Sequence, residues 1–401
     1  LFTQQLGRGL RRAPNKSHLT VIDMIGQHRR EFRFEERLRA ILNPRRGRIK
    51  DQIEQGFPFL PAGCTVELDR MSREIVLENI RAAVGRRRWD ALVRNLREAP
   101  ELGLGEYLDR FELEASDLYK GGRSWAVLRR AAGVKCPPAA DSEREQAMLR
   151  RLGRLTHIDD PERVAFYTEV LRAPEPPRLA GDERRRRLLT MLAWGLGSES
   201  YASLADFYEA LWDERAVRDE LVELLAALDE RSRAAPRLSP LDPAIPLSVH
   251  ARYTRQEVIA ALGHAAGPKP KVTQGGILWV PEAASDVFFV DLRKSERDYS
   301  PTTMYRDYAI NRELFHWESQ SRQAPHQPTV RRYIEHARRG TSILLFVREH
   351  RRDDLGTAPF HFLGPATYVS HQGERPVAFT WRLQTPMPEE LFEVARSVAA
   401  A

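Results

Sequence analysis

The chain has 401 residues and a mass of 46.0 kDa, which is long enough for two or three domains. Hydrophobic residues make up 42% of it and charged residues 30%, so wholesale disorder is excluded, and no run of about 18 apolar residues is present to cross a membrane. Two cysteines, Cys64 and Cys136, are too few for a disulfide framework or an all-cysteine zinc site. We therefore expect a protein of the reducing cytoplasm that has no membrane partner.

The positive charge is concentrated at the start of the chain. The whole sequence carries a net charge of +7, whereas residues 1–50 alone hold 13 Lys or Arg against 4 Asp or Glu, an excess of 13 − 4 = 9. Such a concentration indicates a polyanionic partner, although a solubilising surface would have the same composition.

Three regions follow one another along the chain and predict an α+β multidomain protein. Residues 1–28 combine a basic, helix-like piece with the apolar run 19–26, whose β-branched residues indicate one buried strand of a larger sheet. Residues 29–265 are predicted to form a helical coupler, because stretches such as 221–228 place apolar residues at helical spacing. Proline-rich segments near 137 and 177 are expected to subdivide this region.

Residues 268–401 change to short apolar runs bounded by Gly, Pro and charged turns. The clearest runs are 277–280, 287–290, 343–347 and 378–383. Strands at this spacing predict a barrel or sandwich. This third of the chain also holds 16 of the 34 aromatic residues, which indicates a function for flat rings.

The most specific pattern lies at the start of the chain, where Gln4, Gly7, Arg8 and Arg11 fit Gln-x-x-Gly-Arg-x-x-Arg ahead of the apolar run. Arg8 and Arg11 are about one turn apart on a helix, so both guanidinium groups can reach one transferring phosphate and neutralise its developing charge. Gly7 allows the backbone to approach closely. A basic helix start with no such role is the alternative.

This pattern resembles the final motif of superfamily 2 helicases and translocases, at the end of their second RecA-like lobe. The resemblance implies that residues 1–28 end such a lobe, that Arg8 and Arg11 are catalytic arginine fingers, and that Gln4 and Gly7 contact the nucleotide. The sequence contains no Gly-x-x-x-x-Gly-Lys-Ser/Thr loop and no acidic Walker B box. We therefore expect a C-terminal fragment that cannot hydrolyse ATP alone, with ATP and Mg²⁺ bound only in a full-length protein and no cofactor in this fragment.

Further segments resemble one helicase group that includes type IV, modification-dependent restriction enzymes. The segments that carry this resemblance are 28–34, 56–64, 121–125, 278–282, 298–308 and 315–321. It implies an upstream helicase, an upstream phospholipase D-type nuclease in some members, and a C-terminal barrel similar to PUA and SRA domains that reads modified cytosine in double-stranded DNA. Such a protein would act in cytoplasmic antiviral defence.

The residues between 299 and 321 suit a base reader, which must flip a base out, stack it on rings and satisfy its Watson–Crick edge. Their rings, amides, Arg306 for a phosphate and Asp307 for an exocyclic amine lie close in sequence. The predicted DNA- and base-binding residues are Tyr305, Arg306, Asp307, Tyr308, Trp317, Ser319 and Gln320.

Three alternatives remain open for these residues and for the chain. Strand alternation puts Phe315, Trp317 and Ser319 on one face of a segment, and that face can be core rather than pocket. The C-terminal region can also be a non-catalytic protein-interaction module of a defence or repair assembly, and basic helices alone can bind duplex DNA regardless of sequence. Two further segments have structural alternatives: the helix–turn–helix-like stretch 104–130 can be a plain bundle, and Arg184–Arg187 a solvated helix face.

Overall fold

A computed structural model describes residues 89–396, except 112, 179, 232–236, 239–240, 266, 272–274, 294–306 and 354. The chain divides into two units, residues 1–95 and 96–401. The described residues belong to the second unit, apart from residues 89–95 at the start of α5. The predictions for Gln4, Gly7, Arg8, Arg11, Tyr305 and Arg306, and the whole segment 1–28, lie outside the described residues.

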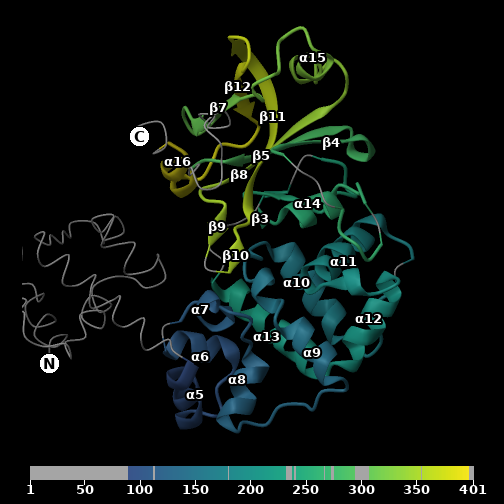
Figure 1. Ribbon diagram of the computed structural model, residues 1–401, viewed down its shortest axis with the longest axis vertical. Coiled ribbons are helices and arrows are strands. Elements are labelled where there is room, and N and C mark those ends of the chain that lie inside the picture. Colours follow the sequence, from purple (N-terminus) through teal and green to yellow (C-terminus); the bar gives the residue numbers. More distant parts are fainter. Residues whose placement is uncertain are drawn as a thin grey trace, which may run out of the picture. The chain divides into compact units, whose positions relative to one another are not determined.

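The described part of the chain up to residue 231 is helical, as predicted. Its α-helices are α5 (Trp89–Glu98), α6 (Leu104–Arg110), α7 (Ala115–Tyr119), α8 (Trp125–Ala132), α9 (Ser142–Leu149), α10 (Pro161–Arg172), α11 (Glu183–Leu196), α12 (Leu204–Asp213) and α13 (Arg215–Arg231), with the short 3₁₀ helix η3 (Leu152–Leu155) before α10. The proline segments near 137 and 177 lie in the α8–α9 and α10–α11 connections. Figure 1 shows α8 to α13 gathered into one helical body.

Local sequence explains where these helices begin and end. Ser124 caps α8 by accepting a hydrogen bond from the Val127 amide, and Asp160 caps α10, whose first residue is Pro161. α11 ends at Gly197, which adopts a left-handed conformation with φ of 95°. The buried face of α12 carries Phe207, Tyr208 and Leu211, and the Tyr208 hydroxyl donates to the Leu189 carbonyl at 2.6 Å.

One mixed sheet forms the C-terminal region. Its strands are β3 (Arg252–Tyr253), β4 (Ile277–Val280), β5 (Ser285–Asp291), β6 (Tyr308–Ala309), β7 (Leu314–Glu318), β8 (Ser342–Arg348), β11 (Phe360–Gln372) and β12 (Ala378–Leu383). The order is β4-β5-β8-β11-β12-β7-β6, with β3 paired to β11; β5 and β8 run parallel and the other pairs antiparallel. Two short ribbons accompany it, β1 (Arg237–Leu238) with β2 (Ser248–Val249) and β9 (Arg352–Asp353) with β10 (Gly356–Thr357).

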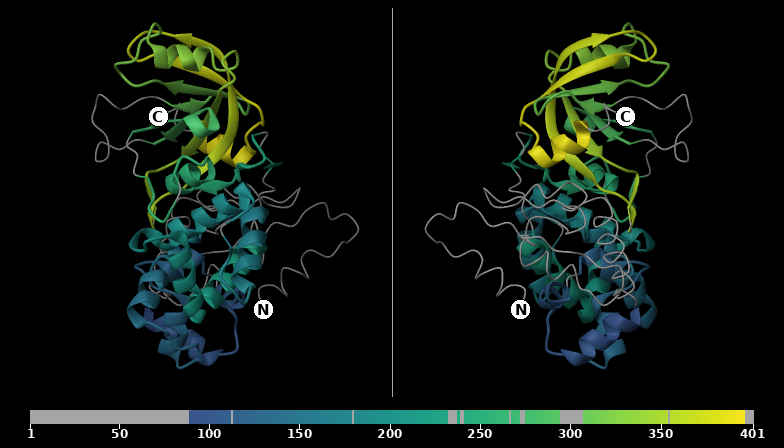
Figure 2. Two further views of the ribbon diagram at one scale, coloured as in Figure 1. Left: turned by 90° about the vertical axis from the view of Figure 1, so that its right-hand side faces the viewer. Right: turned by 90° about the vertical axis from the view of Figure 1, so that its left-hand side faces the viewer.

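The fold is α+β as predicted, and the described strands form an open mixed sheet rather than a closed barrel. They leave β4 and β6 as the two edges of the sheet. The sheet is nevertheless strongly curved (Figure 2), and β11 changes register twice, between Phe362 and Gly364 and between Tyr368 and Ser370. Such bulges bend a strand, so the sheet wraps around its core without joining edge to edge.

Neighbouring residues of a strand point to opposite faces of the sheet, and both faces are covered. Phe288 on β5 packs with Trp317 and Trp381 in a core to which α15 (Pro328–Ile334) contributes Val330 and Tyr333, and residues of α16 (Glu389–Arg396) also join it. Phe289 faces the other way and contacts Phe346 and Phe360. On that side α14 (Arg255–Ala261) joins the sheet to α11, and Arg187 donates to the Ala261 carbonyl at 3.1 Å.

The sheet-bearing region begins before the predicted boundary at residue 268. β2, β3 and α14 all precede this residue, and β3 pairs with β11. The sequence prediction assigns these segments to the helical coupler, because two-residue strands give no hydrophobic periodicity. No helix among the described residues combines the length and the apolar character that a bilayer crossing requires.

Candidate nucleic-acid interface

A cleft of about 1330 Å³ lies where the sheet meets the helical region. Its walls come from η3, the start of α14, the segment before β4, the ends of β5, β7 and β8, and the β9–β10 ribbon. The segments before β4 and after β7 come close together here: a methyl group added to Gly275 would lie 3.8 Å from Nε2 of Gln320. The curvature of the sheet thus brings the segment before β4 and the segment after β7 to the same cleft.

Five arginines give the cleft its charge. They are Arg154, Arg255, Arg322, Arg348 and Arg351. Four carboxylates, Asp291, Asp307, Glu318 and Asp353, also line it, and one of these is already paired with an arginine. Arg154, Arg322 and Arg351 are exposed. The cleft is therefore rich in guanidinium groups that can approach phosphate oxygens in pairs of hydrogen bonds.

Arg255 is half-buried, whereas Arg154, Arg322 and Arg351 of the same cleft are exposed. Its guanidinium carbon lies 4.2 Å from the centre of the Phe289 ring, and Nη2 donates to the Gly275 carbonyl at 2.7 Å. Burial, together with the charges of Arg348 and Arg351, lowers the pKa of Arg255 to about 10, against the opposing effect of Asp291. It stays charged at neutral pH, and an anion beside it would relieve the mutual repulsion of the three arginines.

Arg348 is held in place rather than free to move. Its Nε donates to Asp291 in a buried ion pair, its Nη1 donates to the Ala358 carbonyl at 2.9 Å, and its guanidinium lies 4.1 Å from the centre of the Phe360 ring. The pair sits at the ends of the parallel strands β5 and β8, which register Asp291 opposite Arg348. Parallel pairing therefore fixes the position of the Arg348 guanidinium in the cleft wall.

The predicted base-binding residues separate into two groups. Asp307, Trp317 and Gln320 line the cleft, together with Glu318, whose backbone N–H donates to Oδ1 of Asp307 at 3.0 Å. Tyr308 is not among the residues of the cleft wall, and its ring stacks on His316 with 4.7 Å between the ring centres. The structure brings three of the predicted residues together at one place.

Trp317 and Ser319 lie on the buried face, as strand alternation predicts. Trp317 is 5% exposed and stacks on Phe288 with 4.1 Å between the ring centres, although it also lines the cleft. The Ser319 hydroxyl accepts a hydrogen bond from the Val377 amide at 3.0 Å. Trp317 thus contributes mainly to the core.

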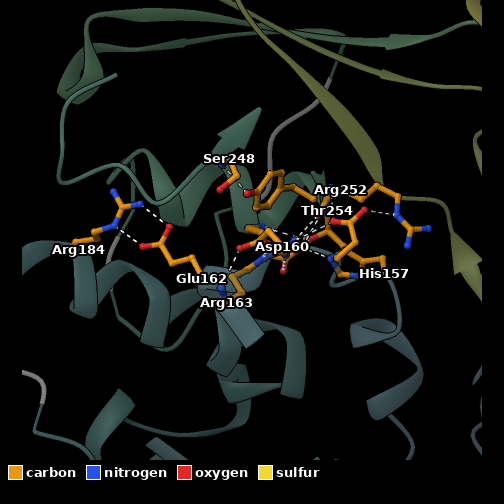
Figure 3. A network of polar contacts seen from close by, with 11 residues as sticks. His157, Asp160, Glu162, Arg163, Arg184, Ser248, Arg252 and Thr254 are labelled. Carbon is orange, nitrogen blue, oxygen red and sulfur yellow. Dashed lines mark hydrogen bonds and ion pairs between the residues drawn. The ribbon is translucent and has the colours of Figure 1, made fainter. Parts of the chain in front are cut away.

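A buried polar hub underlies one wall of the cleft and joins α10 to β3 and α14 (Figure 3). We use this name for His157, Asp160, Arg163, Arg252, Thr254 and Glu257. Arg163 is fully buried; its Nη1 donates to Glu257 at 2.9 Å, its Nη2 donates to the Arg252 carbonyl at 2.7 Å, and its Nε donates to Asp160. Its guanidinium also lies 4.2 Å from the centre of the Tyr253 ring.

Glu257 is the anionic centre of the hub. Nε2 of His157 lies 2.6 Å from its Oε2, and the Thr254 amide and hydroxyl donate to the same oxygen at 2.7 and 2.9 Å. Burial alone would raise the pKa of Glu257, but His157 and Arg163 outweigh burial and lower it to about 2. Glu257 is consequently ionised across the physiological pH range, and its hydrogen bonds hold His157 and Thr254 in the cleft wall.

Sequence reasoning missed this hub, although part of its signal is visible. Asp160–Pro161 is a helix-start pattern, and Thr254 with Glu257 forms a capping box at the start of α14. Both patterns predict helix starts, but neither says that Arg163 and Glu257, 94 positions apart, share a hydrogen bond. Among the described residues no group of three or more His, Cys, Asp or Glu side chains is placed to hold a metal ion.

One family model matches the sheet-bearing region. Residues 247–395 match the family model described as a domain of unknown function, DUF3427. The match begins just before β2 and ends within α16, so it covers the sheet and α14 but not the helices that precede them. No curated protein matches the chain.

Proposed function

We propose that the chain is the C-terminal portion of an ATP-dependent DNA helicase or translocase of a cytoplasmic, type IV restriction system, and that the arginine-lined cleft binds double-stranded DNA. The observation that carries the DNA-binding part is the convergence of five arginines with Asp307, Trp317 and Gln320 in one cleft of about 1330 Å³. The motor part is supported by the sequence resemblance at Gln4, Gly7, Arg8 and Arg11.

The division of labour within the cleft follows from its chemistry. Arg154, Arg255 and Arg351 supply charge for phosphates, which positions DNA but carries no sequence information. Asp307 and Gln320 supply acceptors and donors for a base edge, which suits the predicted recognition of a modified cytosine flipped from the helix. The hub would hold this surface against the helical region, so that bound DNA is sensed by the coupler.

A fluorescence anisotropy titration tests the proposal directly. The ligands are matched duplexes carrying cytosine, 5-methylcytosine or 5-hydroxymethylcytosine, each at two salt concentrations. A preference of tenfold, about 1.4 kcal/mol, supports a modified-base reader. Equal binding to the three duplexes that falls with salt overturns the reader and leaves sequence-blind binding, and no binding at all overturns the DNA-binding part.

Single variants locate the site within the same assay. Arg351→Gln is expected to lower the slope of log affinity against log salt by about 1 without changing preference among the duplexes, because it removes one phosphate contact. Arg338→Gln is the matched control, because Arg338 is 77% exposed, carries the same charge and lies outside the cleft wall. Equal slopes for the two variants would place DNA elsewhere.

The four carboxylates of the cleft favour a second candidate, a non-catalytic protein-interaction module. Asp307, Glu318 and Asp353 would repel phosphates but could pair with basic side chains of a partner protein, whereas Asp291 is already paired with Arg348. This candidate predicts that Arg351→Gln leaves DNA affinity unchanged while a charge reversal at Asp353 abolishes a protein complex.

A further inference from the structure

A second cavity, of about 600 Å³, lies within the helical region. Its wall is built from α8, the end of α10 and the first half of α13. Four arginines line it, namely Arg129, Arg172, Arg215 and Arg218, and three carboxylates, Asp219, Glu220 and Glu223. The proposed DNA-binding cleft shares none of these residues.

The two most enclosed carboxylates already have donors from the protein. Glu220 is 2% exposed and accepts from the amides of Trp125 and Ala126 at 2.6 and 2.7 Å, where α8 begins. Glu223 accepts from the Trp125 indole N–H at 3.0 Å and from the Leu104 amide at 2.9 Å. These carboxylates therefore tie α8 and α6 to α13, and each already accepts two hydrogen bonds from protein donors.

The arginines, by contrast, have donors to spare. Arg129 donates to the Lys135 carbonyl at 2.8 Å and lies 3.6 Å from Glu223, and Arg218 donates to the Trp212 carbonyl at 3.1 Å. The Nε atoms of Arg129 and Arg218 are nevertheless buried without a hydrogen-bond partner within the described structure. A buried donor without an acceptor is unfavourable. Since both guanidinium groups border the cavity, a small turn about the last side-chain torsion would direct further N–H groups into it.

We propose that this cavity binds a small molecule through an oxyanion, with the phosphate group as the chemical class and Arg129 and Arg218 as its principal donors. Guanidinium groups match phosphate with paired, charge-assisted hydrogen bonds. The volume falls in the range of small-ligand sites and exceeds that of a bare phosphate. Leu171, Pro174 and Val222 supply an apolar surface for the remainder of the ligand.

Isothermal titration calorimetry of the full chain with pyrophosphate as the probe tests this site. We expect binding that weakens at least tenfold in Arg218→Gln and in Arg129→Gln, and that is unchanged in the control Arg338→Gln. Circular dichroism establishes that each variant is folded. No binding to the unmodified chain at millimolar pyrophosphate, or equal binding by all three variants, overturns the proposal.

A gain-of-affinity variant keeps the test decisive if an arginine variant fails to fold. Glu220→Gln removes one negative charge from the wall while preserving the shape of the side chain, so pyrophosphate is expected to bind more tightly at pH 8. Unchanged or weaker binding by this folded variant contradicts the site.

Competition distinguishes a free phosphorylated molecule from the phosphates of a nucleic acid. If the ligand is a small molecule, a short duplex leaves pyrophosphate affinity unchanged, even when the duplex is saturating. Displacement of pyrophosphate by the duplex, lost in Arg218→Gln, would overturn the small-molecule assignment and make the cavity a nucleic-acid contact. Because the two cavities share no residues, failure here leaves the DNA-binding cleft standing, and the converse also holds.

Discussion

Two glutamates, Glu220 in the helical region and Glu257 in the polar hub, are equally buried at 2% exposure. Their pKa values nevertheless shift in opposite directions. Burial raises the pKa of Glu220 to about 7, although two backbone amides donate to it. The pKa of Glu257 falls to about 2 because His157 and Arg163 contact its carboxylate and outweigh burial.

The difference shows that hydrogen bonds alone do not offset the loss of water around a charge, whereas a full counter-charge does. At neutral pH Glu257 is ionised, and the hydrogen bonds and ion pairs around it join α10, β3 and α14. The wall around Glu220 differs, because the Nε atoms of Arg129 and Arg218 have no acceptor within the described structure. Satisfied polar groups suit a structural joint, and donors without acceptors suit a ligand site.

The largest expected effect comes from breaking the hub. Arg163→Met leaves the carboxylates of Asp160 and Glu257 buried without their shared cation, so the free energy of unfolding should fall by about 3–5 kcal/mol. Urea denaturation of the full chain at pH 7 measures this. Arg338→Met, at a residue that is 77% exposed, is the control, and a loss below about 1 kcal/mol for Arg163→Met would show that the hub does not stabilise the fold.

Glu220→Gln tests the other side of the comparison through pH. The folded pKa of about 7 lies above the ordinary 4.5, so the folded state binds more protons between these values and stability falls as pH rises through this window. The Glu220 contribution amounts to about 3 kcal/mol of decline from pH 4.5 to pH 8. In the variant this decline should disappear.

The readout is the slope of the free energy of unfolding against pH. A loss of stability from the changed hydrogen bonds that is the same at every pH does not alter this slope. Urea denaturation at several pH values between 5 and 8, on the parent chain and on Glu220→Gln, gives two curves, and the parent should lose stability relative to the variant as pH rises. Parallel curves would mean that Glu220 is ionised throughout and that its pKa is not raised.

His157→Gln should raise the pKa of Glu257, which is the direction in which the pKa of Glu220 is shifted. The glutamine can still donate a hydrogen bond but carries no charge, so the pKa of Glu257 should rise from about 2. A depressed pKa stabilises the fold above pH 4.5, and that contribution is lost as pH falls towards 2, so the variant should lose less stability across this acid window. A rise of one unit corresponds to about 1.4 kcal/mol. Denaturation at pH 2.5 and pH 5 measures the change, and an unchanged difference would assign the low pKa to Arg163 alone.

The sequence predicts the elements better than it predicts the contacts between them. The apolar runs 277–280, 287–290, 343–347 and 378–383 lie in β4, β5, β8 and β12, and the run 221–228 lies in α13. β11 was missed, although it is the longest strand described, because Gly364 and Pro365 interrupt it and its second half is largely exposed. There its side chains follow the bulges rather than a simple alternation.

The candidate site shows the same limit. The chemistry of Asp307, Trp317 and Gln320 predicts a site, and the three residues lie together in the cleft. The sequence does not predict Arg154, Arg255 and Arg351 as their neighbours, because these arginines come from segments far apart in the chain. Trp317 was open to both pocket and core interpretations, and its stacking on Phe288 places most of the ring in the core. The register of β5 against β8, which brings Asp291 to Arg348, is a property of the whole sheet. No local pattern contains it.

The run Arg184–Arg187 provides the smallest effect and extends the comparison to the surface. Arg185 is 51% exposed and pairs with Glu169 at 3.4 Å, so Arg185→Gln should change the free energy of unfolding by about 0.5 kcal/mol or less. Arg184 is 25% exposed; it pairs with Glu162 at 2.5 Å and donates to the carbonyls of Pro243 and Ile245 at 2.6 and 2.8 Å, so Arg184→Gln should cost about 1–2 kcal/mol. Both variants remove the same charge from neighbouring positions of α11, and urea denaturation at pH 7 compares them. Equal losses would mean that the removed charge sets the cost and that enclosure does not.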